Sequence, residues 1–341
     1  MNQTQIVIDA AGGSGGGAGR LKAELDAFLA DGAPPLRVIG WDRQLTPSWL
    51  VLREAAAGRA PVVAALNNVS FTWRGTERRV LVHNALHFLA PDEVRLLGLL
   101  PRSFRAQIPV VRRTLRRADV IVVPCSAMAE RVADRVPAVR DRLLVLANPV
   151  SPVGPRIPAD EVSILVPVVP SPFKNVVREL RVLLAALDRR RHRARVRMTA
   201  HPHELPADLA RHPRLDLLGR LPHHELAEHW RRTTAVFFPC ALESFGYPLA
   251  EARVYGLPVL APDTQQSREI AGAAVVPYRL SDTNSLAEAV DGIDRPVLPE
   301  PYAFERVAYF TRLLGLDRNF ATWSASAPPP RDRDPMRRTV V

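Results

Sequence analysis

The sequence predicts an α/β protein with two Rossmann-like, doubly wound domains that face each other across an interdomain cleft. Three observations support this prediction. The chain of 341 residues is longer than one hydrophobic core comfortably serves, so two domains are expected. Its short apolar runs are continuous rather than alternating, which is typical of parallel strands covered by helices on both faces. A proline-rich segment at 148–160 interrupts these runs midway along the chain.

The apolar runs fall into two groups, one on each side of the proline-rich segment. The first group comprises 6–9, 36–40, 61–66, 79–83, 119–124 and 142–147. The second comprises 162–167, 195–200, 214–219, 234–239, 257–262 and 273–278. We therefore divide the chain into an N-terminal domain at 1–155 and a C-terminal domain at 156–300. A C-terminal helix at 301–316 and a disordered tail at 317–341 follow, because the last segment has no hydrophobic periodicity.

Composition and charge narrow the classes of function. The net charge of +11 invites a nucleic-acid hypothesis, but Lys22 and Lys174 are the only lysines among 46 basic residues. Such an arginine excess in a proline-rich chain is typical of codon bias. The arginine clusters at 112–117 and 189–197 also lack interleaved aromatic residues that would stack on bases. We expect no nucleic-acid partner, and interpret the clusters as solvated helix faces or as contacts with an anionic membrane surface.

The sequence offers no membrane span and no targeting segment. No uncharged apolar stretch reaches the roughly 18 residues that a span needs, and the first residues lead directly into a strand. We expect a cytoplasmic protein, with peripheral contact at the inner membrane face as an open alternative. Cys125 and Cys240 each follow an apolar run and are expected to be buried free thiols. The histidine pairs at 201/203 and 223/224 lack a full ligand set, so we expect no metal and no cofactor.

The segment VIDAAGGSGGGAGRLKAEL, residues 7–25, runs from a strand through a glycine-rich loop into a helix. Gly13, Gly15 and Ala18 match the G-x-G-x-x-A spacing of a dinucleotide site, and Asp42 lies near the expected place of a ribose-binding acid. A turn of this kind indicates only that a ligand, often a phosphate, comes close to the backbone. An NAD(P)-dependent oxidoreductase is therefore one hypothesis.

The strongest functional signal is VFFPCALESFGYPLAEARVYGLPVLAPD, residues 236–263. A strand ends in a loop that contains Glu243, and a helix begins near Tyr247 with Pro248 at its start. The helix N-terminus suits a phosphate, while Glu243 and Glu251 can accept hydrogen bonds from sugar hydroxyls. A sugar nucleotide has both features. The alternative is that Glu243 caps the helix and Glu251 is a solvated acid of its first turns.

The stretch ESFGYPLAEARVYGLPVLA, residues 243–261, resembles the E-x7-E signature of retaining GT-B glycosyltransferases of family four, or group 1. ADVIVVPCSAMAERV at 118–132 resembles the last strand and helix of that family's N-terminal domain, and LDLLGRLPHHEL at 215–226 resembles its nucleobase loop. The resemblance covers roughly residues 5–315. It implies the GT-B fold and metal-independent transfer of a sugar from a nucleotide-sugar donor to an acceptor hydroxyl, with retention through a front-face reaction. The acceptor would be a glycan, a glycolipid or a small-molecule natural product.

The resemblance also implies roles for individual residues. Lys174 and Glu243 would be catalytic, on the donor phosphates and beside the donor sugar, and Glu251 would bind the nucleotide ribose. The remaining donor-binding set would be Ser244, Phe245, Gly246, Tyr247, Arg220, Leu221, Gly16 and Gly17. Many members carry an arginine five residues before the lysine, where this chain has Val169. We expect the helix N-terminus at 246–248 to neutralise the leaving phosphate in place of that arginine.

The N-terminal domain would supply the acceptor site. His83, Asn84 and His87 follow a strand, where family members often have a histidine near the transferred sugar. We therefore assign His83 to catalysis and Asn84 and His87 to the acceptor, with satisfied strand-end histidines as the alternative. The segment LNNVSF at 66–71 is expected to line the same wall. Besides the oxidoreductase, a sugar-nucleotide epimerase or phosphorylase of the same architecture and a non-enzymatic scaffold remain open.

Overall fold

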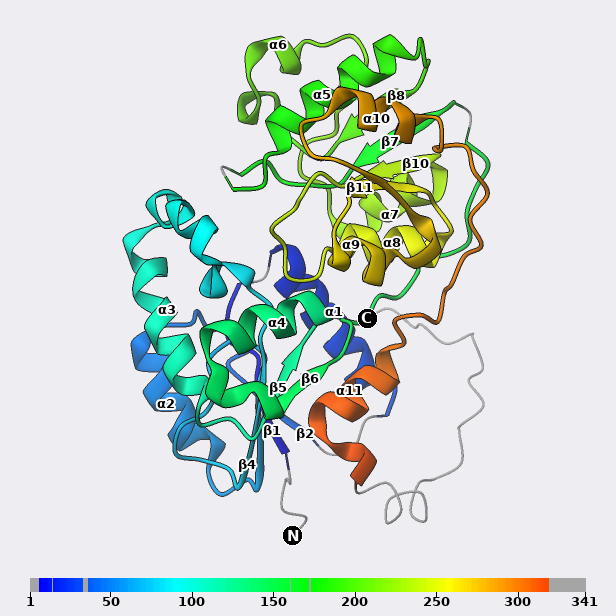
Figure 1. Ribbon diagram of the computed structural model, residues 1–341. Helices are drawn as coiled ribbons and strands as arrows, with labels where there is room; N and C mark the ends of the chain where they lie inside the picture. The colour runs from blue at the N-terminus through cyan, green and yellow to red at the C-terminus, as the bar shows by residue number, and fades with distance from the viewer. Residues whose placement is uncertain (1–5, 14, 33–35, 160, 172, 319–341) are drawn as a thin grey trace, which may run out of the picture.

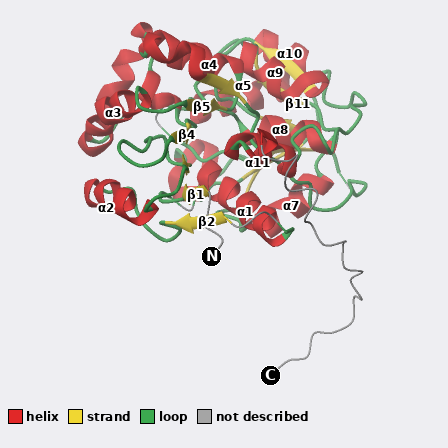
Figure 2. Cartoon of the chain, turned by 90° about the horizontal axis from the view of Figure 1, so that it is seen from below, coloured by secondary structure: helices red, strands yellow, loops and turns green. Residues whose placement is uncertain are grey.

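A computed structural model describes residues 6–13, 15–32, 36–159, 161–171 and 173–318. In these residues the chain forms two six-stranded sheets, and every paired strand is parallel to its neighbour. Each apolar run identified in the sequence overlaps one strand, and only the strand Glu77–Leu81 begins before its run. The two sheets lie in separate halves of the molecule, with helices around them (Figures 1 and 2). This confirms the predicted α/β fold with two doubly wound sheets.

The first half contains the sheet of order β2-β1-β3-β4-β5-β6. β1 and β3 are neighbours, and the chain leaves β1 in one direction toward β2 and returns on the other side to β3. In open parallel sheets such a switch point opens a crevice at the carboxyl ends of the two strands. The elements are β1 (Ile6–Asp9), α1 (Gly16–Ala30), β2 (Leu36–Ile39), α2 (Pro47–Ala57), β3 (Val62–Ala65), β4 (Glu77–Leu81), α3 (Arg102–Leu115), β5 (Val120–Val123), α4 (Ser126–Arg135) and β6 (Leu143–Val145).

The second half contains the sheet of order β12-β11-β10-β7-β8-β9, with its switch point between β7 and β10. The strands are β7 (Ser163–Val166), β8 (Arg195–Met198), β9 (Leu215–Leu217), β10 (Ala235–Phe237), β11 (Val259–Pro262) and β12 (Val275–Tyr278). The helices are α5 (Val176–Arg189), α6 (Ala207–Ala210), α7 (His223–Arg232), α8 (Tyr247–Tyr255), α9 (Gln265–Ala271) and α10 (Thr283–Val290). Figure 1 shows α8 and α9 on the side of this half that faces α1 and α4.

The last described helix, α11 (Arg306–Leu314), packs against the first half (Figure 1). The ring of Phe310 stacks on Phe28 of α1, with centroids 5.0 Å apart. Arg306 pairs with Glu24 at 2.8 Å, and Glu24 also accepts hydrogen bonds from Ser151 between the two sheets. These contacts join α1, α11 and the connecting segment. One expectation was wrong: β5 is not the last strand of the first sheet, because β6 pairs beside it at the edge.

A buried ion pair lies below the carboxyl end of β1. The carboxylate of Asp9 accepts hydrogen bonds from Arg53 at 2.8 Å, from Asn67 at 2.8 Å and from the Trp49 indole at 3.1 Å. Arg53 is 1% exposed and also donates to the Ser70 carbonyl. A buried charge of this kind is tolerated only when its partners satisfy it. The network therefore connects α2 and the segment after β3 to the end of β1.

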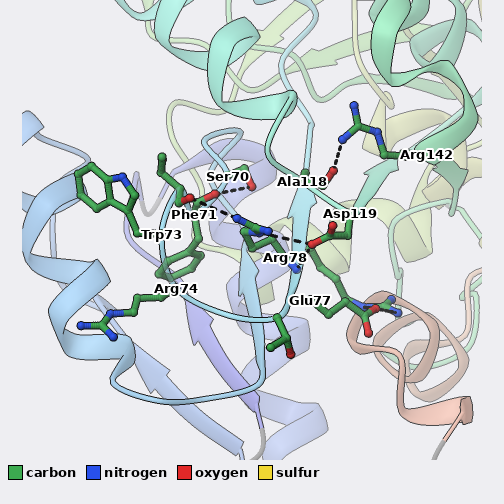
Figure 3. Close-up of polar contacts among 12 residues, drawn as sticks. Ser70, Phe71, Trp73, Arg74, Glu77, Arg78, Ala118, Asp119 and Arg142 are labelled. Carbon is green, nitrogen blue, oxygen red and sulfur yellow. Dashed lines mark hydrogen bonds and ion pairs between the residues drawn. The ribbon is translucent and has the colours of Figure 1, made fainter.

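The segment between β3 and β4 is held at its other end by surface arginines (Figure 3). Arg78 donates from its backbone amide to Asp119 at 2.8 Å and from its guanidinium to the Thr72 carbonyl at 3.2 Å. Arg142 donates to the Ala118 carbonyl at 2.6 Å. The Arg78 contact therefore ties Thr72 in the β3–β4 segment to β4, and the Arg142 contact ties the chain before β5 to the chain before β6.

We expect Arg53→Met to lower the free energy of unfolding by about 3–5 kcal/mol, because it leaves the buried Asp9 carboxylate without its counter-charge. Urea unfolding followed by circular dichroism measures the change. The control is Arg59→Met, since Arg59 is exposed; it should change stability by less than about 0.5 kcal/mol. A loss for Arg53→Met as small as that of the control would contradict the assigned role of the network.

Candidate functional site

The second half brings Lys174 and Glu243 together at its switch point. Lys174 follows β7 and Glu243 follows β10, and these strands are neighbours although 69 positions separate the two residues. The ammonium donates to the Glu243 carboxylate at 2.9 Å, and both side chains are about one quarter exposed. Burial works against the charged lysine, but attraction to Glu243 outweighs it, so the pKa of Lys174 lies above its ordinary value. Lys174 therefore stays protonated beside Glu243 at the edge of the sheet.

Helix α8 begins directly after this pair. Gly246 is its N-cap and has φ +79°, a left-handed conformation that glycine adopts without strain. Pro248 occupies the first turn, and Gly256 ends the helix with φ +65°. Ser244 and Phe245 are buried in the loop before the helix. The loop that carries Glu243, the partner of Lys174, therefore leads within three residues to the positive end of the α8 helix dipole.

Glu251 lies in the second turn of α8 and pairs with Arg20 of α1. The distance from the Arg20 guanidinium to the carboxylate is 2.6 Å, and the Glu251 side chain is 6% exposed. Burial raises the pKa of Glu251, and Arg20 offsets part of that rise. The solvated alternative for Glu251 is therefore wrong. Its carboxylate is a buried acceptor held between the two halves of the molecule.

Further contacts connect the two halves around the same place. The Ser244 hydroxyl donates to the His83 carbonyl at 2.7 Å, and the buried Cys125 thiol lies 3.2 Å from the Ser244 carbonyl oxygen. The backbone amide of Ser126, at the start of α4, donates to the Glu269 carboxylate of α9. A Cβ atom on Gly17 would lie 3.2 Å from the Tyr247 ring. The two halves are thus closed on each other at α8.

The switch point of the first half opens into a cavity of about 250 Å³. Side chains from four strand ends and from α3 surround it, and most of their polar groups are uncharged. The lining includes Lys22, Gln44, Asn67, Asn68, His83 and Gln107 beside the glycine loop at 10–13. Asn68 has φ +69°, and its amide oxygen accepts a hydrogen bond from the His83 backbone at 2.8 Å. The expectation that 66–71 lines the same wall as His83 is confirmed for 66–68.

The three residues expected near an acceptor occupy different environments. His83 lines the cavity, and burial lowers the pKa of its imidazole to about 4, so the ring is neutral at physiological pH. Asn84 is half-buried and its side chain caps the 3-10 helix Ala85–Phe88. His87 is 3% exposed and stacks on Phe104 of α3 at 4.7 Å, and the cavity lining does not include it. The structure therefore brings only His83 to the cavity.

Comparison with known proteins finds one family model that matches part of the chain. Residues 207–300 match the model of the family Glycosyl transferases group 1, a segment that includes Glu243 and Glu251. The C-terminal half of the chain is therefore similar to that family over this segment. No curated protein matches the sequence.

Solved structures agree at the level of the fold. Sucrose-phosphate synthase from Thermosynechococcus elongatus is 17% identical with a TM-score of 0.60, over 95% of this chain and 100% of the other. WaaG, a glycosyltransferase of lipopolysaccharide biosynthesis, is 12% identical with a TM-score of 0.59, over 94% and 100%. HepE from Anabaena, solved with UDP and glucose, is 13% identical with a TM-score of 0.57, over 95% and 100%. The chain therefore shares the GT-B fold of these structures.

The other predicted donor-binding residues are distributed around the second half of the molecule. Arg220 follows β9, two strands from β7, where it donates to the Thr199 carbonyl and pairs with Glu204. Leu221 beside it is half-buried. Val169 is 50% exposed and offers no charge. The structure does not bring these three into contact with the Lys174–Glu243 pair.

Two expectations about chemistry can be compared with the described residues. Cys125 and Cys240 are free and buried, as predicted. Burial raises the pKa of the Cys125 thiol to about 11, so it carries no charge at neutral pH. Within the described part of the chain, no three His, Cys, Asp or Glu side chains are grouped to hold a metal ion. None of its described helices is both long enough and apolar enough to cross a membrane.

The sequence analysis missed several residues of the site. Arg20 was overlooked although it lies in the glycine-rich segment, because its partner Glu251 is 231 positions away. Gln44 and Gln107 carry no motif, and only the fold brings them to the cavity. A signal for Arg20 was available, since it is the first charged residue after the glycine loop.

We expect Gly246→Ala to lower the free energy of unfolding by about 1–2 kcal/mol and to displace the start of α8. A side chain in the left-handed conformation is strained, and its Cβ would lie 3.0 Å from Leu249 and 3.1 Å from Phe238. The control is Gly98→Ala, where φ is not positive and no atom lies within 4 Å. Urea unfolding measures both. Equal stability of the two variants would show that Gly246 is not required at this N-cap.

Proposed function

We propose that this protein is a glycosyltransferase that moves a sugar from a nucleotide-sugar donor to an acceptor hydroxyl with retention of the anomeric configuration, without a metal ion. The observation that carries the proposal is the Lys174–Glu243 pair beside the N-terminus of α8. A charged lysine and the positive end of a helix dipole suit a diphosphate, and the adjacent carboxylate suits sugar hydroxyls. HepE, which shares the fold, was solved with UDP and glucose.

Each group on the donor side has a distinct role in this proposal. Lys174 binds the diphosphate and stabilises the charge that develops when it leaves. Glu243 accepts hydrogen bonds from the transferred sugar, and Glu251 accepts them from the ribose. Backbone groups of 244–247 contact the phosphates, while Gly16 and Gly17 allow the α1 loop to approach them. Arg220 and Leu221 border the nucleobase.

The acceptor binds in the cavity of the first half. Amide side chains of Gln44, Asn67 and Gln107 and the neutral His83 can donate and accept hydrogen bonds, which suits a compound with several hydroxyl groups. Asn84 lies beside this wall, and His87 supports it from behind by stacking on Phe104. The closed contact between Ser244 and His83 brings the two sites together.

The transfer then proceeds on one face of the donor sugar. The bond between the anomeric carbon and the diphosphate oxygen breaks, and its electron pair stays on the leaving phosphate. The acceptor oxygen forms the new bond to the anomeric carbon, and its proton moves to the leaving phosphate oxygen. Closure of the two halves excludes water and so limits hydrolysis of the donor.

We expect one of UDP, GDP, ADP or dTDP, or one of the corresponding nucleotide sugars, to raise the melting temperature, because binding to the folded state stabilises it. Glu251→Gln should abolish the shift, and Lys174→Met should reduce it for diphosphates. Asp208→Asn is the matched control, because Asp208 of α6 forms an exposed ion pair with Arg181 of α5. Thermal-shift measurements supply the data.

Two outcomes would contradict the proposed donor site. If no nucleotide of the panel raises the melting temperature, the proposed nucleotide-sugar donor is contradicted. If Glu251→Gln leaves the rise in melting temperature unchanged, the assignment of Glu251 to the ribose is contradicted. Product analysis with the bound nucleotide sugar then separates transfer from the other reactions. An altered sugar nucleotide formed without an acceptor would indicate an epimerase, and a requirement for inorganic phosphate would indicate a phosphorylase.

We also propose that the first half contacts an anionic membrane surface through residues 94–118. This segment has seven arginines and no acidic residue. It also exposes Val94, Leu99 and Val110, by 50%, 53% and 40%. Such a combination favours an anionic lipid surface by charge complementarity and shallow apolar burial. Gln107 of α3, which lies within this segment, lines the cavity of the first half. An acceptor at the lipid surface would therefore be close to that cavity.

We expect the protein to sediment with vesicles that contain 30% phosphatidylglycerol, less so with purely zwitterionic vesicles, and less at high salt. Reversing two arginines, Arg113→Glu with Arg116→Glu, should weaken binding at least about tenfold, since each basic group near the surface contributes about 1 kcal/mol. Arg193→Glu with Arg211→Glu is the control with the same change in net charge. Equal loss in both double variants would show that only net charge matters.

A further inference from the structure

Each of the two carboxylates around α8 is paired with a cation. Glu243 pairs with Lys174 from its own half at 2.9 Å. Glu251 pairs with Arg20 from the other half at 2.6 Å, and the Arg20 side chain is only 16% exposed. The proposed function already places Lys174 on the donor diphosphate. Arg20 is the corresponding cation at the ribose end of the donor.

Arg20 also lies against the start of α8. Its guanidinium carbon is 5.6 Å from the ring centroid of Tyr247, the first residue of that helix. Gly17, one turn earlier on α1, approaches the same ring closely enough that a Cβ would lie 3.2 Å from it. The first two turns of α1 therefore lie across the first turn of α8. The guanidinium is therefore held on the first two turns of α8, between the Tyr247 ring and the Glu251 carboxylate.

The charge of a diphosphate supports a role for this group. A nucleoside diphosphate of a sugar carries two negative charges, and Lys174 supplies one positive charge. Val169, where related enzymes have an arginine, supplies none. Lys22 is directed elsewhere, since its ammonium donates to the carbonyls of Gly12 and Trp41. Arg20 can supply the second charge without moving away from α8.

We propose that Arg20 is a donor-binding residue whose guanidinium bridges the Glu251 carboxylate and the phosphate next to the ribose. This inference rests on the proposed function and adds a residue of the first half to the donor site. A guanidinium has five N–H donors in a planar fork, so one nitrogen can stay on Glu251 while another reaches a phosphate oxygen. A carboxylate has about four acceptor positions, so Glu251 can hold Arg20 and still accept a ribose hydroxyl.

The bridge has a consequence for the closed arrangement of the two halves. Because Arg20 belongs to α1 and Glu251 to α8, a donor that binds both residues connects the halves through its own phosphate and ribose. Opening would separate the phosphate from one of its two cations. The donor diphosphate therefore favours closure, and the free nucleoside favours it less.

The test measures how much the phosphates add to affinity. Kd is measured by calorimetry for UDP, GDP, ADP and dTDP and for the four matching nucleosides, and the best-binding pair is used. The ratio of the nucleoside Kd to the diphosphate Kd is the phosphate increment. We expect Arg20→Gln to reduce this increment about tenfold to a hundredfold, as for loss of a hydrogen bond between charged groups. Arg20→Lys should retain part of it, because the charge stays but the fork is lost.

Three results would overturn the inference. An equal loss for nucleoside and diphosphate would mean that Arg20 only positions Glu251. Tighter binding in Arg20→Gln would mean that Arg20 competes with the donor. An unchanged increment would mean no contact with phosphate. If the wild-type protein binds no nucleotide, the proposed function fails instead, so the two failures are distinguishable.

Two controls keep the result independent of folding. The melting temperature of each variant without nucleotide reports damage to the interface between the halves. In a Glu251→Gln background the ion pair and the ribose contact are already lost, so this control measures the affinity for inorganic pyrophosphate, which Arg20→Gln should still reduce if Arg20 contacts phosphate. No further reduction in that background would overturn the inference. Arg59→Gln, at an exposed position of the same half, should leave both Kd values unchanged.

Discussion

The candidate site depends on the switch of chain direction between β7 and β10. All strands of the sheet are parallel, so their carboxyl ends lie at one edge, and two strands far apart in the sequence become neighbours there. Lys174 and Glu243 are brought within 2.9 Å only by this arrangement. Their pairing in turn places a fixed charge beside the first turn of α8. Without the switch point the two residues would have no common environment.

The same constraint operates a second time in the first half. The switch between β1 and β3 opens the cavity that His83 and Asn67 line, and the buried Asp9–Arg53 pair fixes its floor. Two crevices of one origin therefore face each other, and contacts such as Ser244 with His83 bring them together. A donor in one crevice and an acceptor in the other would meet at this contact. The same sheet topology in each half thus places the loops after the strands where Ser244 of one half contacts His83 of the other.

The sequence predicted the parts that depend on local pattern. Continuous apolar runs identified the strands because parallel strands are buried on both faces, and Gly246 with Pro248 identified the start of α8 because their backbone preferences are local. Contacts across the fold were beyond such patterns. His87 follows a strand as His83 does, yet α3 covers it and stacks Phe104 on its ring. The place of Arg20 directly after the glycine loop was a signal for Arg20 itself, but sequence spacing indicates neither its partner Glu251 nor the contribution of Gln107 to the cavity.

Lysine is nearly absent from this chain, which has two lysines among 46 basic residues, and both lie at the switch points. Lys174 pairs with Glu243 in the second half, and Lys22 lines the cavity in the first, where its ammonium donates to two backbone carbonyls. A compact ammonium with rotatable donors fits among converging carbonyls and crowded oxygens, whereas a planar guanidinium needs an open, fork-shaped partner. If composition alone set the choice between the two basic residues, arginine would be expected at both places. The geometry of the two crevices therefore gives a physical reason for lysine at these positions, and it connects the composition of the chain to the places where its two sheets open.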